Sequence, residues 1–185
     1  MLKNKKRVKN VTMTISEEDV EKELELHDQL DLVLVLAIGP SPAPHLVVQK
    51  RAILLSKLLG VDSEAEPYHY GLYSETITEK LQSAKNATLF RKRDGKYELT
   101  PMGMRAYEIL KRLVVKKGED ILHFIEILHR ISDDELLALT YHLFPESFEE
   151  SKIKEKVRAM IEQFKGKGII KARREGEKIV LEADA

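Results

Sequence analysis

The sequence predicts a mainly helical α+β fold that carries two small β-hairpins. Apolar residues recur with helical spacing over much of 17–165, and strand-like runs flank Asp94-Gly95 and Glu175-Gly176. A tight Asp-Gly turn between two such runs is a strong hairpin signal. The 185 residues suffice for one domain or two small ones, and an apolar content of 43% argues against global disorder.

Caps and breakers set the expected elements of the first half. Residues 1–16 are expected to form a basic arm with a short strand over 11–15, where apolar residues alternate with threonine. A capping box at Ser16 predicts a helix over 17–38 that is broken near His27. The elements that follow are expected as a helix over 45–59 ended by Gly60, a loop over 61–67, a helix over 75–86 capped by Ser74, a hairpin over 89–99, and a helix from Pro101 to about Gly118.

The second half repeats this order of elements. Capping boxes begin with Ser132 and with Ser147, where Glu150 is the second member. The expected elements are helices over 119–131, 132–144 and 147–165, followed by a hairpin over 169–182.

Three helices followed by a two-stranded hairpin is the order of a winged helix-turn-helix, in which the third helix can enter a DNA groove and the hairpin, or wing, can contact the backbone. The first such unit is a winged-helix domain over 17–118. Residues 119–185 form either a second winged helix in tandem or a helical dimerisation domain with a C-terminal hairpin.

Short motifs in the middle of the chain resemble those of the Panacea-domain proteins, which include SocA-type antitoxins. The similar segments are Val48–Leu55 ("LQK-hydrophobic" helix), Tyr68–Ser74 ("YGPYS", with Leu72 in place of proline), Tyr97–Gly103 ("Y-x-L-T-x-x-G") and Leu136–Pro145 ("LL…Y…YP"). The resemblance covers about 45–145. It implies a winged-helix-like fold, either transcriptional control or an antitoxin or adaptor role, and no catalytic residues.

Charge is strongly segregated although the net charge is zero. Acids dominate 17–31 and 119–150, whereas bases dominate 85–117 and 165–178. Two interpretations stay open: the basic blocks bind an anionic partner, or acidic and basic blocks neutralise each other within the fold or across a dimer.

Double-stranded DNA is the anionic partner that we expect. The helix over 75–86 is a poor groove reader because its expected outer face, Glu75, Glu79, Gln82, Ser83 and Asn86, is anionic. The helix over 151–165 is the better candidate, and both hairpins carry bases suited to phosphate contact. The candidate nucleic-acid-binding residues are Arg91, Lys92, Arg93, Lys96, Lys154, Arg158, Lys165, Lys171, Arg173 and Arg174. For Tyr68, Tyr70 and Tyr73 we expect packing in the core rather than base stacking.

Other classes of function find little support. The chain has no cysteine, no apolar run near the roughly 20 residues of a membrane span, and no phosphate-binding or nucleophile motif. Its six histidines are scattered, so we expect no metal, no cofactor and no enzymatic activity. The sequence thus predicts a cytoplasmic, homodimeric transcriptional regulator that binds DNA. The alternative is an antitoxin- or adaptor-like protein-interaction module, with the acidic 119–150 segment as a contact.

Overall fold

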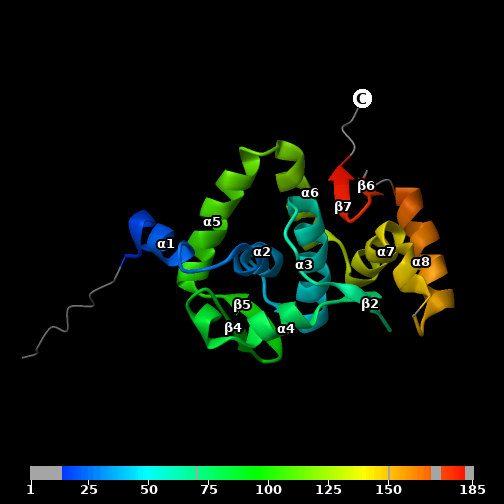
Figure 1. Ribbon diagram of the computed structural model, residues 1–185, viewed down its shortest axis with the longest axis horizontal. Helices are drawn as coiled ribbons and strands as arrows, with labels where there is room; N and C mark the ends of the chain where they lie inside the picture. Colours follow the sequence, from blue (N-terminus) through cyan, green and yellow to red (C-terminus); the bar gives the residue numbers. More distant parts are fainter. Residues whose placement is uncertain (1–13, 70, 150, 168–171, 182–185) are drawn as a thin grey trace, which may run out of the picture.

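The computed structural model describes residues 14–69, 71–149, 151–167 and 172–181. This part of the chain is mainly helical with small antiparallel sheets, which confirms the α+β class (Figure 1). One hydrophobic cluster extends from Val20 to Ile179, so the two halves share a core. The strand expected over 11–15 is absent at Thr14 and Ile15, and its other residues lie outside the described part.

The N-terminal helical region is interrupted where the sequence predicts. Helix α1 (Glu17–Leu24) and helix α2 (Gln29–Ile38) are separated by a short turn, and the Asp28 side chain accepts from the backbone N–H of Asp31 at 3.0 Å. Nearly all of α2 is buried. A helix that is apolar on all sides requires neighbours on all sides, which explains why the rest of the fold surrounds it.

Helix α3 (His45–Leu59) has the predicted ends and lies at the centre of the molecule (Figure 1). It follows strand β1 (Ala43–Pro44) directly and ends at Gly60, which adopts a left-handed conformation. Every residue from 47 to 56 is buried. Helix α3 contacts α2, α4, α6, α7 and strands of all three sheets, so it joins the two halves.

The first expected hairpin is present and gains a third strand. Strands β4 (Phe90–Arg93) and β5 (Lys96–Leu99) pair around Asp94 and Gly95, whose φ angles of 49° and 78° fit a type I′ turn. Strand β1 pairs with β5, which gives the order β1-β5-β4. A two-residue strand has too little pattern to be predicted from sequence.

Helix α4 (Glu75–Gln82) is shorter than the predicted helix over 75–86. A 3₁₀ helix, η1 (Ala84–Thr88), follows it. The prediction that Asn86 points outward is wrong: its side chain is buried and donates to an Asp31 oxygen at 3.0 Å and to the Lys80 carbonyl at 2.9 Å. Satisfying this buried amide favours the tighter turn over a further turn of α-helix.

The predicted loop over 61–67 ends in a strand. Strand β2 (Glu66–Tyr68) pairs with β3 (Gly71–Tyr73), and the hairpin extends beside α7 (Figure 1). Core packing was the wrong expectation for Tyr68, whose exposed fraction is 51%. Tyr73 is half-buried, and Tyr70 lies outside the described residues.

The second half has the predicted order of elements. Helix α5 (Pro101–Val115) ends the first half. The second half contains α6 (Glu119–Arg130), α7 (Asp133–Leu143), α8 (Lys154–Lys167), β6 (Ala172–Glu175) and β7 (Lys178–Leu181), with an unpredicted 3₁₀ helix, η2 (Pro145–Phe148), before α8. Strands β6 and β7 form the second hairpin, but no third strand joins them in the described part of the chain. This half therefore differs from the unit that contains β1.

The predicted capping box at Ser147 is wrong. Ser147 is buried in η2 and its hydroxyl donates to the Phe144 carbonyl at 2.7 Å, so it caps no helix. Helix α8 begins later, at Lys154, and Glu150 lies outside the described residues. The proline at the start of η2 is compatible with a single tight turn there.

Gly103 allows α5 to lie directly against the strand region. A Cβ atom at this position would be 1.8 Å from the Leu89 carbonyl oxygen. Because backbone atoms surround the site, Gly103→Ala should lower the free energy of unfolding by roughly 1–3 kcal/mol or more. Urea denaturation measures this. Gly95→Asn is the matched control, since a Cβ at Gly95 meets no atom within 4 Å and asparagine tolerates positive φ. An unchanged midpoint for the Gly103 variant would contradict the close approach.

His129 makes stability depend on pH. Its Nε2 donates to the Leu36 carbonyl at 2.8 Å, and burial, together with the nearby Arg51, lowers its pKa from 6.5 to about 4. Between these values the unfolded chain binds a proton that the folded chain does not. Stability should therefore fall by up to about 3 kcal/mol as the pH drops from 6.5 to 4. Urea unfolding at several pH values should show a weaker dependence for His129→Gln, and parallel curves for both proteins would contradict the assignment.

Candidate nucleic-acid interface and acidic groove

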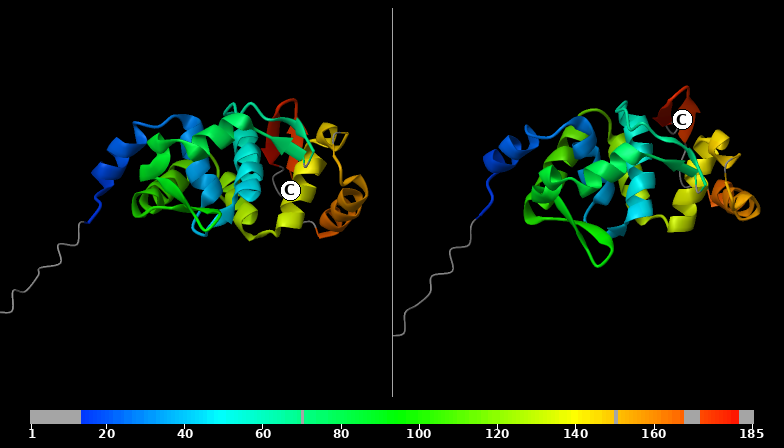
Figure 2. Two further views of the ribbon diagram at one scale, coloured as in Figure 1. Left: turned by 90° about the horizontal axis from the view of Figure 1, so that it is seen from below. Right: turned by 60° about the horizontal axis from the view of Figure 1, so that its bottom comes forward.

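The hairpin β4–β5 presents four exposed cations, Arg91, Lys92, Arg93 and Lys96. The Arg91 side chain binds the Glu98 carboxylate at 2.8 Å, and Arg93 approaches the same carboxylate at 3.6 Å. Among the described residues, Lys92 and Lys96 have no acidic side chain within 4.0 Å, and the Lys92 ammonium lies 5.7 Å from the centre of the Tyr97 ring. The hairpin, which projects from the body in Figure 2, thus keeps an excess of positive charge.

Two candidate basic residues of α8, exposed Arg158 and half-buried Lys154, contact neighbouring side chains. Arg158 pairs with Glu155 at 3.2 Å, and its guanidinium lies 5.5 Å from the centre of the Phe148 ring. Lys154 lies 5.9 Å from the same ring. The side chain of Lys165 is outside the described part of the structure.

The second hairpin uses its arginines within the fold. Arg174 is paired with Glu146 and with Glu177 at 3.0 Å, and it lies 4.8 Å from the centre of the Phe144 ring. Arg173 pairs with Glu175 at 2.6 Å. Lys171 lies outside the described residues. Arg174 thus attaches the hairpin to the end of α7, and these contacts account for the arginine without any role in DNA binding.

The predicted cations do not form one patch. Hairpin β4–β5 lies at one side of the molecule, whereas α8 and hairpin β6–β7 lie at the other, in all three views (Figures 1 and 2). One flat partner surface therefore cannot contact all of these cations at once. The structure therefore divides the predicted interface into two separate candidates.

Ion pairs between the charged blocks account for part of the charge segregation. Arg112 binds Glu17 at 2.6 Å and Lys85 approaches Asp31 at 3.6 Å, which joins the first acidic block to the first basic block. The second pair of blocks is joined by Arg174 and Glu146. Neutralisation inside the fold thus accounts for some of the basic residues, but not for the tip of β4–β5.

Helix α4 has the anionic outer face that the sequence predicts. Glu75, Glu79 and Gln82 are exposed. Lys80, also on α4, binds the carboxylates of Asp28 at 2.5 Å and Asp31 at 2.9 Å. These two carboxylates raise the pKa of Lys80, whereas its ammonium helps to lower theirs. The lysine stabilises the position of α4 and leaves its outer face acidic.

Three consecutive polar residues of α3 bind main-chain atoms of the elements that pack around this helix. The amide of Gln49 donates to the Ser74 carbonyl at 2.8 Å and accepts from the Ser74 N–H at 3.2 Å. Lys50 donates to the Leu72 carbonyl at 3.1 Å, and burial lowers its pKa to about 8. Arg51 donates to the Leu128 carbonyl at 3.0 Å. The polar part of the "LQK" resemblance thus lies inside the protein.

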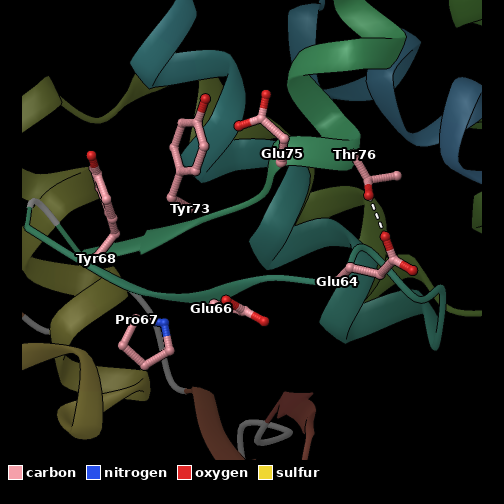
Figure 3. A pocket seen from close by; sticks show the side chains of 7 residues that line it. All are labelled: Glu64, Glu66, Pro67, Tyr68, Tyr73, Glu75 and Thr76. Atoms are coloured by element: carbon pink, nitrogen blue, oxygen red, sulfur yellow. Dashed lines mark hydrogen bonds between the residues drawn. The ribbon is translucent and has the colours of Figure 1, made fainter.

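An acidic groove of about 710 Å³ lies between strands β2–β3 and the start of α4 (Figure 3). The rings of Tyr68 and Tyr73 stand side by side there, with centres 5.4 Å apart. The Tyr73 hydroxyl is 2.7 Å from the Thr78 hydroxyl, to which Gln49 also donates at 2.8 Å. Helix α3 therefore fixes one aromatic wall of the groove.

Three carboxylates line the same groove: Glu64, Glu66 and Glu75. Glu64 accepts from the Thr76 hydroxyl (Figure 3). Glu75 lies in the first turn of α4, where the helix dipole favours a negative charge. Among the described residues no basic side chain pairs with any of the three. Glu66, exposed on β2, has neither a hydrogen bond nor a helix end to account for it.

A second, smaller hollow of about 200 Å³ lies between α3 and α7. Its lining is mostly apolar, and Leu46 in it has an exposed fraction of 53%. Asp133 and Asp134, from the first turn of α7, also line it. This places part of the predicted acidic contact segment beside exposed apolar surface.

Sequence reasoning did not identify the groove. Its acids come from a predicted loop, from an unpredicted strand and from the start of α4, and the three-residue pairing of β2 with β3 brings them together. The run of acids and tyrosines over 64–75 was the available signal. Within the described ranges, no helix has the length and apolar character to cross a bilayer, and no three His, Asp or Glu residues are grouped to hold a metal ion.

Comparison with known proteins adds no relative. No protein-family model matches the chain, and no curated protein or solved structure matches it. The resemblance to the Panacea-domain proteins therefore stays a prediction.

Gln49 offers a test of how α4 is held. Gln49→Leu keeps the volume but leaves the buried N–H of Ser74 without its partner and removes one of the donors to the Ser74 carbonyl. We expect a loss of roughly 2–4 kcal/mol in the free energy of unfolding, with faster amide exchange at Ser74. The control, Gln82→Leu, changes an exposed residue of α4 and should stay within about 0.5 kcal/mol. Equal effects of the two variants would show that the Gln49 hydrogen bonds are not what holds α4.

Proposed function

We propose that the chain is a winged-helix DNA-binding protein, with β4–β5 as the wing that contacts the phosphate backbone. One observation carries the proposal: β1 adds to the exposed basic hairpin, and helix α2, strand β1, helix α3, helix α4 and hairpin β4–β5 form a packed unit in that chain order, with hairpin β2–β3 inserted between α3 and α4. This is the element order in which a helix and a wing approach DNA together. Transcriptional regulation as a homodimer is the role that we propose for it.

The distribution of charge favours contact through the wing. Lys92 and Lys96 are exposed without an acidic partner in the described structure. Arg91 and Arg93 both pair with the carboxylate of Glu98, and Arg93 also approaches that of Asp94. The anionic outer face of α4 disfavours deep insertion next to phosphate. Binding dominated by the wing would be largely independent of sequence, because phosphate contacts supply affinity and little specificity.

The wing proposal predicts that the affinity for DNA falls with salt, and that removal of the wing cations reduces both the affinity and its salt dependence. Each phosphate contact should contribute about 0.9 to the slope of log affinity against log salt. The combined Arg91→Ala, Lys92→Ala and Arg93→Ala variant should therefore bind random duplex more weakly and with a shallower slope. Fluorescence anisotropy of a labelled duplex at several salt concentrations measures both quantities.

A matched control separates the two basic regions. The double variant Lys154→Ala and Arg158→Ala removes one half-buried and one exposed cation from α8, on the side of the molecule away from the wing. We expect it to retain the wild-type salt slope. If this variant loses affinity and the wing variant does not, α8 is the interface; if the unmodified protein fails to bind any duplex at low salt, the DNA proposal is wrong.

A protein-interaction module is the second candidate function. The hollow between α3 and α7 favours it, because exposed Leu46 lies beside Asp133 and Asp134. Pull-downs from native lysate with wild-type and Leu46→Glu baits test this function. A partner retained by the wild type and lost by the variant would support it, and identical profiles would remove the hollow from consideration.

A further inference from the structure

We propose that the groove between β2–β3 and α4 binds an arginine-bearing, extended segment of a protein partner. This inference goes beyond DNA binding and does not depend on it. The groove faces its occupant with carboxylates and aromatic rings, and duplex DNA would be repelled there.

The occupant must be cationic because the groove gathers like charges that the fold does not neutralise. Glu64, Glu66 and Glu75 line one hollow, and no basic side chain in the described structure pairs with them. Several acids elsewhere in the chain do have basic partners, as in the pairs of Lys80 with Asp28 and Asp31. Like charges placed together without counter-charges oppose folding, so a bound cation would relieve a cost that the fold alone retains.

The aromatic wall favours arginine over lysine or a metal ion. Tyr68 is half exposed, and its ring centre lies 4.7 Å from that of His69 and 5.4 Å from that of Tyr73. A guanidinium is planar, stacks on such rings, and binds a carboxylate through two parallel hydrogen bonds. In Figure 3 the Tyr73 ring and the Glu75 carboxylate lie next to each other, which suits stacking and pairing by one side chain.

The size and fixation of the groove favour a segment of chain. A volume of about 710 Å³ exceeds the needs of one side chain and suits several residues. The Tyr73 hydroxyl is held by Thr78, and Thr78 in turn by buried Gln49, so this wall is in place before binding. A preformed wall lowers the entropic cost of association.

The test uses a fluorescein-labelled peptide of alternating arginine and glycine, three of each, and the full-length protein at low salt. Fluorescence anisotropy should show saturable binding that weakens as salt increases. The same peptide with neutral citrulline in place of arginine should not bind. Glu66→Gln should weaken binding roughly five-fold, and Tyr68→Ala about two- to five-fold.

Matched variants separate a specific site from general attraction. Glu79→Gln removes the same charge from an exposed position on α4 that does not line the groove, and it should change the affinity less than two-fold. Circular dichroism of each variant excludes a loss of fold. The triple alanine variant of the wing should bind the peptide as the wild type does, so that a failure of DNA binding leaves this measurement intact.

Four results would overturn the proposal. The peptide does not bind, or Glu79→Gln weakens binding as much as Glu66→Gln. Spermine displaces the peptide at matched charge concentration, which would assign the groove to small polyamines. A synthetic peptide of residues 1–13 binds more tightly than the arginine-glycine peptide, which would assign the groove to the basic amino-terminal segment of this chain.

Discussion

The arrangement of the whole molecule depends on the way in which central helix α3 satisfies main-chain carbonyls with its side chains. Gln49 binds Ser74 at the start of α4, Lys50 binds Leu72 in β3, and Arg51 binds Leu128 at the end of α6. All three side chains are buried, where a polar group without a partner is costly. Each bond therefore fixes a neighbouring element at one position, and packing alone would tolerate more variation.

Much of the helical architecture follows from local sequence, because caps and breakers act over three or four residues. The ends of α3 and the start of α7 at Ser132 are of this kind. The errors occur where distant residues decide. Asn86 leaves the helical pattern because Asp31, 55 positions earlier, accepts its amide, and Ser147 turns to a carbonyl within its own turn instead of capping α8. Such competition cannot be read from periodicity.

The candidate sites divide in the same way. The hairpin β4–β5 was predictable because Asp94-Gly95 favours a tight turn, and the basic side chains next to such a turn are expected to be exposed. The role of Arg174 was not, since its partner Glu146 and the Phe144 ring belong to another element. The groove escaped prediction for the same reason: strand β2 has only three residues, one of them Pro67, so it carries no alternation that would indicate a strand.

Helix α4 separates surfaces of opposite charge, and this has a consequence for how they interact. The basic hairpin lies to one side of the helix, and strand β2, which borders the acidic groove, lies to the other (Figure 1). A duplex held by the wing would bring phosphates toward Glu75 and Glu79, which oppose them. An arginine bound in the groove would reduce that repulsion, since charges within about 8–10 Å still interact at physiological salt. The two binding events would then favour each other. Because coupling between sites is reciprocal, bound DNA would raise the affinity for the basic partner by the same factor as the bound partner raises the affinity for DNA.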